Sequence, residues 1–418
     1  MILRARVVLP VRRPPIEDGA VAIERGCVQA VGTWREISRF AGGKVADLGE
    51  VVLLPGLINA HCHLDYTAMA GEITAPRSFT DWIQSITTLK AGWSEGEFAE
   101  SWLAGARMLL ASGTTTVADI EAVPELLPEV WQTTPLRVFS FLEMTGVKSR
   151  GQPGQILAAA LAKIDSLPQN HNGRCRAGLS PHAPYSTRLD LLCLSAEWAR
   201  SRNLRLTTHV AESVEEFDMF FHGRGTMHDW LQRNGRVMDD CGRGSPVRRL
   251  ESAGLLGENL LAVHANYLHA GDARLLAQSG SSVVHCPRSH NFFGHCPFPF
   301  RELNGEGVNL CLGTDSLATT LEPRGQALRL DLFAEMRAFE KVNPAVSPDA
   351  ILRMATMNGA KALGEAGQLG ELSPGAHADL ITVPFSGDLA SATEAVIGHE
   401  GAVRASMIDG DWSISPES

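Results

Sequence analysis

The sequence lacks an excess of positive charge and lacks any long apolar run. Its 37 Lys and Arg residues against 47 Asp and Glu residues give a formal net charge of −10, which provides no electrostatic footprint for nucleic acid or anionic lipid. No stretch reaches the eighteen apolar residues of a membrane span, and four arginines interrupt the first thirteen residues, so no signal peptide is predicted. We therefore expect a soluble, cytoplasmic protein without nucleic-acid or membrane partners.

Paired cysteines and the common short catalytic motifs are also missing. The eight cysteines are scattered singly, without the C-x-x-C spacing of a zinc ribbon or redox centre, and are predicted to be free thiols. There is no G-x-S-x-G, no G-x-x-x-x-G-K-[ST], no H-E-x-x-H and no G-x-G-x-x-G opening a helix. Elbow-type serine hydrolases, P-loop proteins, zincin proteases and dinucleotide-binding folds are therefore excluded.

The middle of the chain alternates short apolar runs with helical stretches, a pattern typical of a parallel sheet built from βα units. With 44% apolar residues in 418, the chain can bury a large core. Eight units predict an α/β fold of the (β/α)₈ TIM-barrel type, and an open doubly wound sheet is the alternative. The eight predicted strands are 57–63, 115–120, 136–143, 176–181, 205–210, 260–264, 282–285 and 308–313.

Helices are predicted between and after these strands, and one connection is unusually long. Segment 213–257 exceeds an ordinary βα loop, so we expect a helical insertion that folds like a lid over the strand ends. Ser347 suits the cap of the last helix and Gly364 suits its end. The predicted helices are 98–111, 155–165, 189–201, 270–279, 324–340 and 347–363.

Both ends of the chain contain short β runs separated by turn signals, such as Asp409-Gly410. We expect the two ends to come together as one small β-sandwich module beside the barrel. The predicted division is 1–54 for the first part of the module, 55–368 for the barrel and 369–418 for the second part.

Six of the fourteen histidines end or directly follow a predicted strand, and an aspartate follows the eighth strand in the same way. In a barrel the carboxyl ends of all strands open onto one face, where catalytic groups gather. These residues would then surround a single cavity although they are distant in sequence. They are His61, His63, His182, His209, His264, His285 and Asp315.

A metal site is predicted at this face. His61 and His63 have the period-two spacing that points both imidazoles to one side of a strand, although such a pair standing alone is more often incidental or structural. His209 and Asp315 at comparable strand ends complete a set of three imidazoles and one carboxylate, which suits one Zn²⁺ or Fe²⁺ ion with a position left for water. No predicted strand contains a lysine that could bridge two metals, so we expect one ion.

Other polar residues are predicted to carry the chemistry. Glu212, three residues after His209, is placed to move protons, and His264 to polarise the water or the leaving group. His182 is predicted to contact the substrate, with Ser289 and His290 as further candidates. The alternatives are a solvated loop glutamate and buried structural histidines.

Taken together, the motifs resemble those of the amidohydrolase superfamily, over nearly the whole chain. The branch that they resemble most comprises metal-dependent aminohydrolases of adenosine-like compounds: the S-adenosylhomocysteine, methylthioadenosine and 6-aminodeoxyfutalosine deaminases. The motifs are PGLINAHCHLD (55–65), SPHAPYS (180–186), THVAE (208–212), VHANYL (263–268), VHCPRS (284–289), LGTDS (312–316) and LRMATMNGAKALG (352–364).

The resemblance implies a (β/α)₈ barrel, one divalent ion held by His61, His63, His209 and Asp315, and hydrolytic removal of an amino group from a purine-type ring. His182 resembles the residue that contacts the ribose in the nucleoside branch, which favours a nucleoside over a free base. It also implies catalytic roles for Glu212, His264 and Asp315, a small-molecule substrate and a possible homodimer.

Other functional hypotheses remain open at this point. One is hydrolysis of guanine, cytosine, a triazine C–Cl bond or a cyclic amide on the same scaffold, and another is a non-catalytic metal-binding barrel. The basic residues that would bind a substrate carboxylate are not assigned, although Arg77, Lys148 and Arg150 lie in predicted loops.

Overall fold

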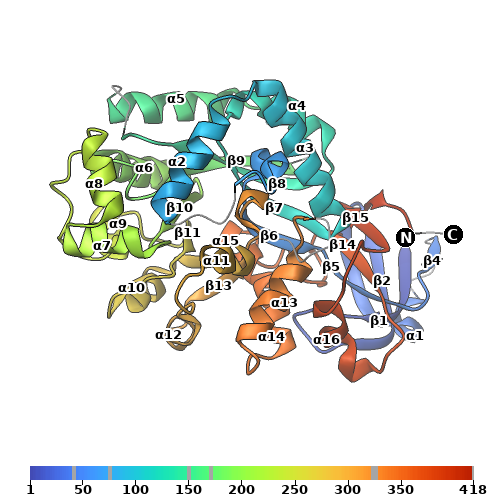
Figure 1. The fold of residues 1–418 in the computed structure, drawn as a ribbon. Helices are drawn as coiled ribbons and strands as arrows, with labels where there is room; N and C mark the ends of the chain where they lie inside the picture. Colours follow the sequence, from blue (N-terminus) through green and yellow to red (C-terminus); the bar gives the residue numbers. More distant parts are fainter. Residues whose placement is uncertain (40–43, 74–77, 148–151, 169–172, 322–327, 417–418) are drawn as a thin grey trace.

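The computed structural model of the chain describes residues 1–39, 44–73, 78–147, 152–168, 173–321 and 328–416. Figure 1 shows a barrel surrounded by helices and, beside it, a β module that contains both ends of the chain. Each part has its own sheet of eight strands.

The barrel sheet consists of eight strands in sequence order, all paired in parallel. Its strands are buried on both faces, as expected for apolar runs enclosed by helices. All eight predicted strands are confirmed, with ends shifted by one residue at most. They are β6 (Leu57–Cys62), β7 (Thr114–Glu121), β8 (Arg137–Met144), β9 (Cys175–Pro181), β10 (Leu206–Val210), β11 (Leu260–His264), β12 (Ser282–His285) and β13 (Asn309–Leu312).

The first and last strands close the barrel. The backbone N–H groups of Thr314 and Asp315 both donate to the His61 carbonyl, at 3.0 and 3.1 Å. Gly313 permits this contact, because a Cβ atom there would lie 2.8 Å from the His61 carbonyl oxygen. Closure excludes the open doubly wound sheet, and it brings residues about 250 positions apart to the same strand ends.

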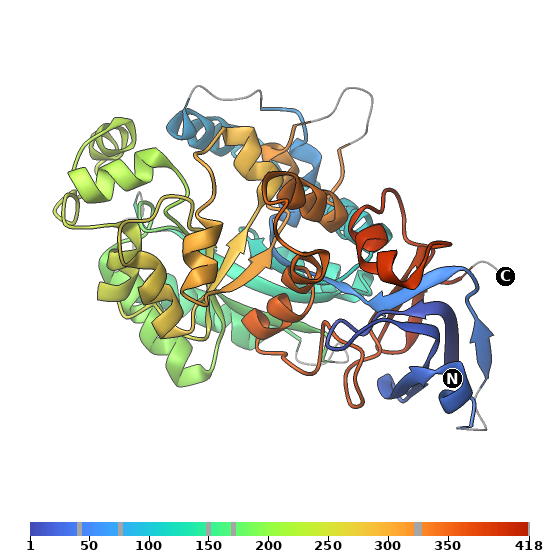
Figure 2. The same cartoon turned by 90° about the horizontal axis from the view of Figure 1, so that it is seen from below.

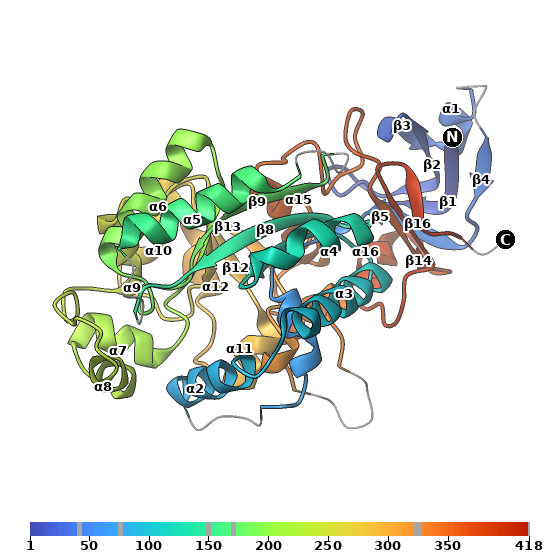
Figure 3. The same cartoon turned by 90° about the horizontal axis from the view of Figure 1, so that it is seen from above.

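Helices cover the outside of the barrel, and a helical insertion follows β10, as predicted for segment 213–257. Figure 3 shows two helices of this insertion, α7 and α8, beside α2 at one end of the barrel. The helices of the barrel region are α2 (Phe79–Lys90), α3 (Glu95–Ala111), α4 (Leu127–Thr133), α5 (Pro153–Ser166), α6 (Leu189–Arg202), α7 (Val214–His222), α8 (Thr226–Arg233), α9 (Pro246–Ser252), α10 (Asp272–Ser279), α11 (Pro287–Phe293), α12 (Phe300–Gly305), α13 (Leu332–Val342), α14 (Pro348–Met354) and α15 (Met357–Leu363).

The prediction of one continuous helix over 347–363 is wrong, because the chain breaks between α14 and α15. The Ala355 carbonyl accepts the backbone N–H of Ile58 on β6, at 2.8 Å, instead of continuing the helical ladder. Thr356 has φ −139° and ψ −99°, outside the helical region. The barrel strand therefore interrupts a sequence whose local pattern is helical throughout.

The prediction for 324–340 also needs correction. The observed helix α13 begins at Leu332, where the side chain of Asp331 accepts the N–H of Phe333 at 2.8 Å and so caps the first turn. Residues 322–327 lie outside the described part of the chain. Helices α2, α4, α11 and α12 of the barrel region were not predicted.

The second sheet joins the two ends of the chain, as expected (Figure 2). Antiparallel pairing of β14 with β5 connects the C-terminal strands to the N-terminal ones. The domain boundaries themselves remain predictions. The strands of this module are β1 (Ile2–Val8), β2 (Ile16–Glu24), β3 (Cys27–Thr33), β4 (Val45–Asp47), β5 (Val51–Pro55), β14 (Leu380–Pro384), β15 (Ala405–Ile408) and β16 (Asp411–Ile414), with the helices α1 (Trp34–Ile37) and α16 (Ala392–Ile397).

No helix in the described ranges is both long enough and apolar enough to cross a lipid bilayer.

Candidate active site

The four residues predicted as metal ligands meet at the carboxyl ends of the barrel strands. His61 lies near the end of β6, His63 follows that strand, His209 lies on β10 and Asp315 follows β13. The Nε2 atoms of His63 and His209 are 3.3 Å apart, and Asp315 Oδ1 lies 3.6 Å from His61 Nε2 and 3.8 Å from His63 Nε2. All four side chains are buried, so the barrel brings the predicted set together.

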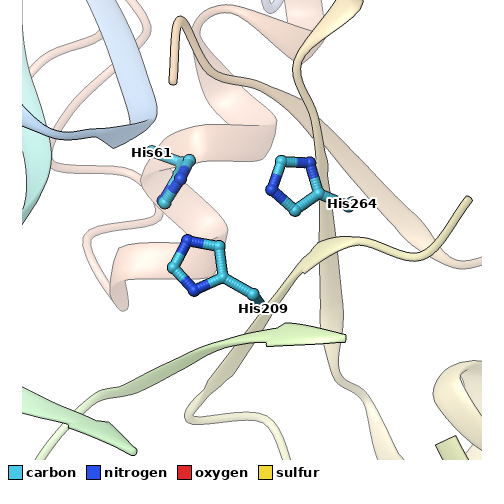
Figure 4. Close-up of side chains that lie close together, drawn as sticks. All are labelled: His61, His209 and His264. Atoms are coloured by element: carbon cyan, nitrogen blue, oxygen red, sulfur yellow. The ribbon is translucent and has the colours of Figure 1, made fainter. Parts of the chain in front are cut away.

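This set of donors fits a divalent cation. Both ring nitrogens of His61 and Nε2 of His264 are buried without a hydrogen-bond partner among the described residues. Figure 4 shows the rings of His61, His209 and His264 gathered around one space. Buried imidazole nitrogens that face each other without donors between them are costly unless a cation binds there, and three imidazoles with a carboxylate suit Zn²⁺ or Fe²⁺.

Neighbouring groups orient two of these ligands. His209 donates its Nδ1–H to the His182 carbonyl oxygen at 2.9 Å, which leaves Nε2 as the coordinating atom. The hydroxyl of Ser289 donates to Asp315 Oδ2 at 2.6 Å, which turns Oδ1 toward the imidazoles. Burial acts to raise the pKa of Asp315, but the contact with His61 outweighs it and the pKa lies well below the usual value. The carboxylate form of Asp315, the form that a metal ligand needs, is therefore favoured.

The backbone of the site is strained at two of its functional residues. His264 has φ 75° and Asp315 has φ 54°, both in the left-handed region that non-glycine residues rarely adopt. Such conformations persist only where the surrounding structure enforces them, and they concentrate at functional sites. The strand ends are thus shaped to direct these two side chains.

Glu212 and His264 lie next to the predicted metal ligands, as expected for a proton-transfer pair. Glu212 Oε1 is 3.4 Å from His264 Nε2, and one donor atom from each of Glu212, His264 and Asp315 lies within 4.8 Å of the other two. Burial, followed by the charge of Asp315, raises the pKa of Glu212 well above its usual value. Burial lowers the pKa of His264 to about 3. Burial therefore favours the uncharged form of both side chains.

A cavity of about 320 Å³ opens above these groups and is large enough for a small organic molecule. Residues predicted as metal ligands and as catalytic groups line it at one end, and aromatic side chains form much of its wall: Tyr66, Phe79, Trp82, Tyr185 and Trp230. Because Trp230 belongs to α8, the predicted insertion does cover the strand ends.

The three residues predicted to contact the substrate lie in different surroundings. His182 lines the cavity, and its Nδ1 is 2.6 Å from the Ser186 hydroxyl. Ser289 is buried against Asp315, and Nδ1 of His290 is 3.1 Å from Asn266 Oδ1. Neither Ser289 nor His290 is among the described residues that line the cavity. Ser289 thus holds the side chain of Asp315, a predicted metal ligand. Contact of Ser289 or His290 with substrate stays a prediction.

The structure places the remaining strand-end histidine, but not the candidate basic residues. His285 is buried and stacks on Phe298 with ring centroids 3.8 Å apart, outside the cavity lining. Arg77, Lys148 and Arg150 lie outside the described residues.

Sequence reasoning missed two charged residues in the cavity wall, Lys90 and Glu143. Lys90 ends the unpredicted helix α2, which lines the cavity at positions 79, 82, 83, 86, 87 and 90. That helical spacing was a readable signal. Glu143 ends the predicted third strand, so the rule that located the histidines also pointed to it.

The amidohydrolase family profile matches residues 52–413, most of the chain. The chain belongs to the amidohydrolase family. This membership confirms the resemblance and the prediction of a hydrolytic enzyme.

Several curated relatives of this amidohydrolase have similar names. A 5-methylthioadenosine/S-adenosylhomocysteine deaminase of Syntrophobacter fumaroxidans is 32% identical over 384 residues, covering 88% of this chain and 80% of that protein. A Pyrococcus furiosus protein of the same name is 29% identical over 371 residues, covering 87% and 81%.

Solved structures resemble it over its whole length. A zinc-bound adenosine deaminase of Xanthomonas campestris has a TM-score of 0.82 and 25% identity, covering 99% of this chain and 92% of the other. Aminofutalosine deaminase of Helicobacter pylori, in complex with methylthio-coformycin, has a TM-score of 0.87 and 22% identity, covering 99% and 100%. The second likeness establishes the shared fold.

Proposed function

We propose that this amidohydrolase is a metal-dependent deaminase that replaces the 6-amino group of a purine nucleoside by hydrolysis and releases ammonia. The observation that carries the proposal is the triangle of Glu212, His264 and Asp315 beside the imidazole cluster, at the floor of an aromatic cavity. The names of the curated relatives support the same chemistry. The proposed substrates are S-adenosylhomocysteine, methylthioadenosine and 6-aminodeoxyfutalosine.

His61, His63, His209 and Asp315 are the proposed ligands of one divalent ion, Zn²⁺ or Fe²⁺. Such an ion supplies a Lewis acid and lowers the pKa of water toward about 7. His182 fixes the orientation of His209 through its backbone carbonyl, and Ser289 fixes that of Asp315. A backbone carbonyl and a neighbouring hydroxyl would therefore set the orientations of His209 and Asp315 toward a bound ion.

The chain's own residues provide the proton transfers. Glu212, protonated in its buried position, donates a proton to the ring nitrogen next to the carbon that bears the amino group. Asp315 and His264 orient the attacking water and accept its proton. Asp315 and His264 pass that proton to the departing amine, so that ammonia leaves. Glu212 recovers its proton from the new hydroxyl group as this group becomes the carbonyl of the product. The aromatic walls hold the flat ring against these groups.

The experiment is a substrate panel. Metal-loaded protein is offered adenosine, methylthioadenosine, S-adenosylhomocysteine, 6-aminodeoxyfutalosine, guanine, cytosine and a chlorinated aminotriazine, while ammonia, chloride and the ultraviolet spectrum are followed. We expect ammonia and a hypoxanthine spectrum from at least one 6-aminopurine nucleoside, well above the other compounds. Chloride release, or turnover of a free base alone, would replace the proposal by one of the rival hydrolyses.

The free state of all eight cysteines supports the proposed cytoplasmic location. Cell fractionation tests it, since recovery of the native protein outside the cytoplasm would contradict it.

A further inference from the structure

One carboxylate in the cavity wall has no hydrogen-bond donor from the described part of the chain. Glu143 lies on β8 with its side chain 13% exposed. Its Oε1 is 3.6 Å from His182 Nε2 and its Oε2 is 4.0 Å from Lys90 Nζ, both beyond hydrogen-bond length. A nearly buried carboxylate without donors is costly, so a bound molecule that donates to it would be favoured.

The surroundings of Glu143 keep it ionised and in place. Burial acts to raise its pKa, but Lys90 and His182 outweigh this effect, and the pKa lies below the usual glutamate value. Lys90 is itself held by the hydroxyl of Tyr66 and lies 4.6 Å from the centre of that ring. An ionised carboxylate only accepts hydrogen bonds, so the partner must bring donors.

Glu143 lies beside His182, the residue that stands between it and the imidazole cluster. The ring of His182 lies 4.8 Å from that of His209, and Glu143 is one contact farther along the same wall. A purine with its amino-bearing carbon at the cluster would extend past His182. The next group of the molecule, the sugar, would then reach Glu143.

We propose that Glu143 accepts hydrogen bonds from the two hydroxyls of a vicinal diol, the 2′ and 3′ hydroxyls of a ribose. The two carboxylate oxygens receive one hydroxyl each, while Lys90 and His182 hold the carboxylate between them. This inference rests on the proposed deaminase function. It narrows the substrate class to ribonucleosides and excludes free bases and nucleosides whose sugar lacks the diol.

The test compares adenosine with 2′,3′-dideoxyadenosine. For the wild type we expect kcat/KM for adenosine to exceed that for the dideoxy compound about ten- to hundredfold, the effect of hydrogen bonds to a charged group. In Glu143→Ala this ratio falls to near one, because the rate on adenosine drops and that on the dideoxy compound does not. Glu143→Gln keeps the shape and shows an intermediate ratio, and Glu129→Gln, at an exposed position on α4, keeps the wild-type ratio.

Two further outcomes separate this inference from the function on which it rests. If the wild type deaminates both compounds at equal rates, the deaminase stands and the role of Glu143 is wrong. If it deaminates no 6-aminopurine, the proposed function falls and the inference falls with it. A ratio that stays high in Glu143→Ala with full metal content also overturns the role of Glu143.

Discussion

Both ends of the barrel contain buried polar side chains, but the two ends differ in whether these side chains have hydrogen-bond partners. At the amino end, Arg137 at the start of β8 is bonded to Asp379 at 2.6 and 3.3 Å and also to Asp409. Asp379 accepts the backbone N–H of Asp409 as well, at 2.9 Å. At the carboxyl end, by contrast, both ring nitrogens of His61 lack partners in the described chain.

This difference separates a structural network from a functional one. Buried charges with full sets of partners join the barrel to the β module, since Arg137 belongs to the barrel and both aspartates to the module. Buried polar atoms without hydrogen-bond partners lower the stability of the fold. Such atoms are retained where a bound metal ion or substrate supplies the missing partner. Substitutions at the amino end should therefore change stability, and those at the carboxyl end should change metal binding and turnover.

The largest effect is expected for Glu212→Gln. Loss of the proton donor should reduce kcat about 10²- to 10⁴-fold, while the metal content stays at one ion because Glu212 is not a proposed ligand. Steady-state kinetics and elemental analysis measure both quantities, and Glu197→Gln, exposed on α6, is the control. An unchanged kcat would remove Glu212 from the mechanism.

Next comes Arg137→Met at the opposite end. It leaves Asp379 buried without its cation, which should lower the free energy of unfolding by about 3–5 kcal/mol. The half-buried Asp409 keeps its contact with His377, at 3.1 Å. Urea unfolding measures the change, and the folded fraction should keep its metal and its kcat. A loss below about 1 kcal/mol, or a selective loss of activity, would show that the two ends are not separable in this way.

A smaller effect is expected when a metal ion binds the imidazole nitrogens that have no hydrogen-bond partner. Zn²⁺ added to chelated protein at a hundred times its Kd should raise the free energy of unfolding by about 2.7 kcal/mol. Thermal unfolding with and without the metal measures the gain, and His61→Ala should lose most of it. Equal gains in both proteins would place the metal elsewhere.

The smallest effect is expected for Ser289→Ala. Removing the 2.6 Å hydrogen bond to Asp315 frees the carboxylate to rotate, and loss of such a supporting contact typically weakens metal affinity about 10- to 100-fold. Competition with a chromogenic chelator measures the affinity. If affinity holds while KM rises, Ser289 contacts substrate, as the sequence predicted, and does not support the ligand.

The sequence predicted the eight barrel strands and the metal-ligand cluster for one physical reason. Apolar runs mark strands buried on both faces, and parallel strands bring residues such as His61 and Asp315 to one edge whatever their separation along the chain. Local information alone was therefore sufficient for both.

Features that depend on packing between distant segments were beyond the sequence. The break at Thr356 arises because β6 takes the carbonyl of Ala355, and nothing in the helical pattern around it announces this. The bond from Ser289 to Asp315 likewise exists only in the closed barrel. Lys90 was missed for another reason, since the helix that carries it was not predicted.

The most direct test of the central claim is ammonia release from methylthioadenosine and adenosine by one preparation in three states: as purified, after chelation, and after Zn²⁺ or Fe²⁺ is restored. The account predicts release that disappears with chelation and returns with the metal, at about one ion per chain. Release that survives complete removal of the metal, or its absence in protein that holds a full metal site, would contradict it.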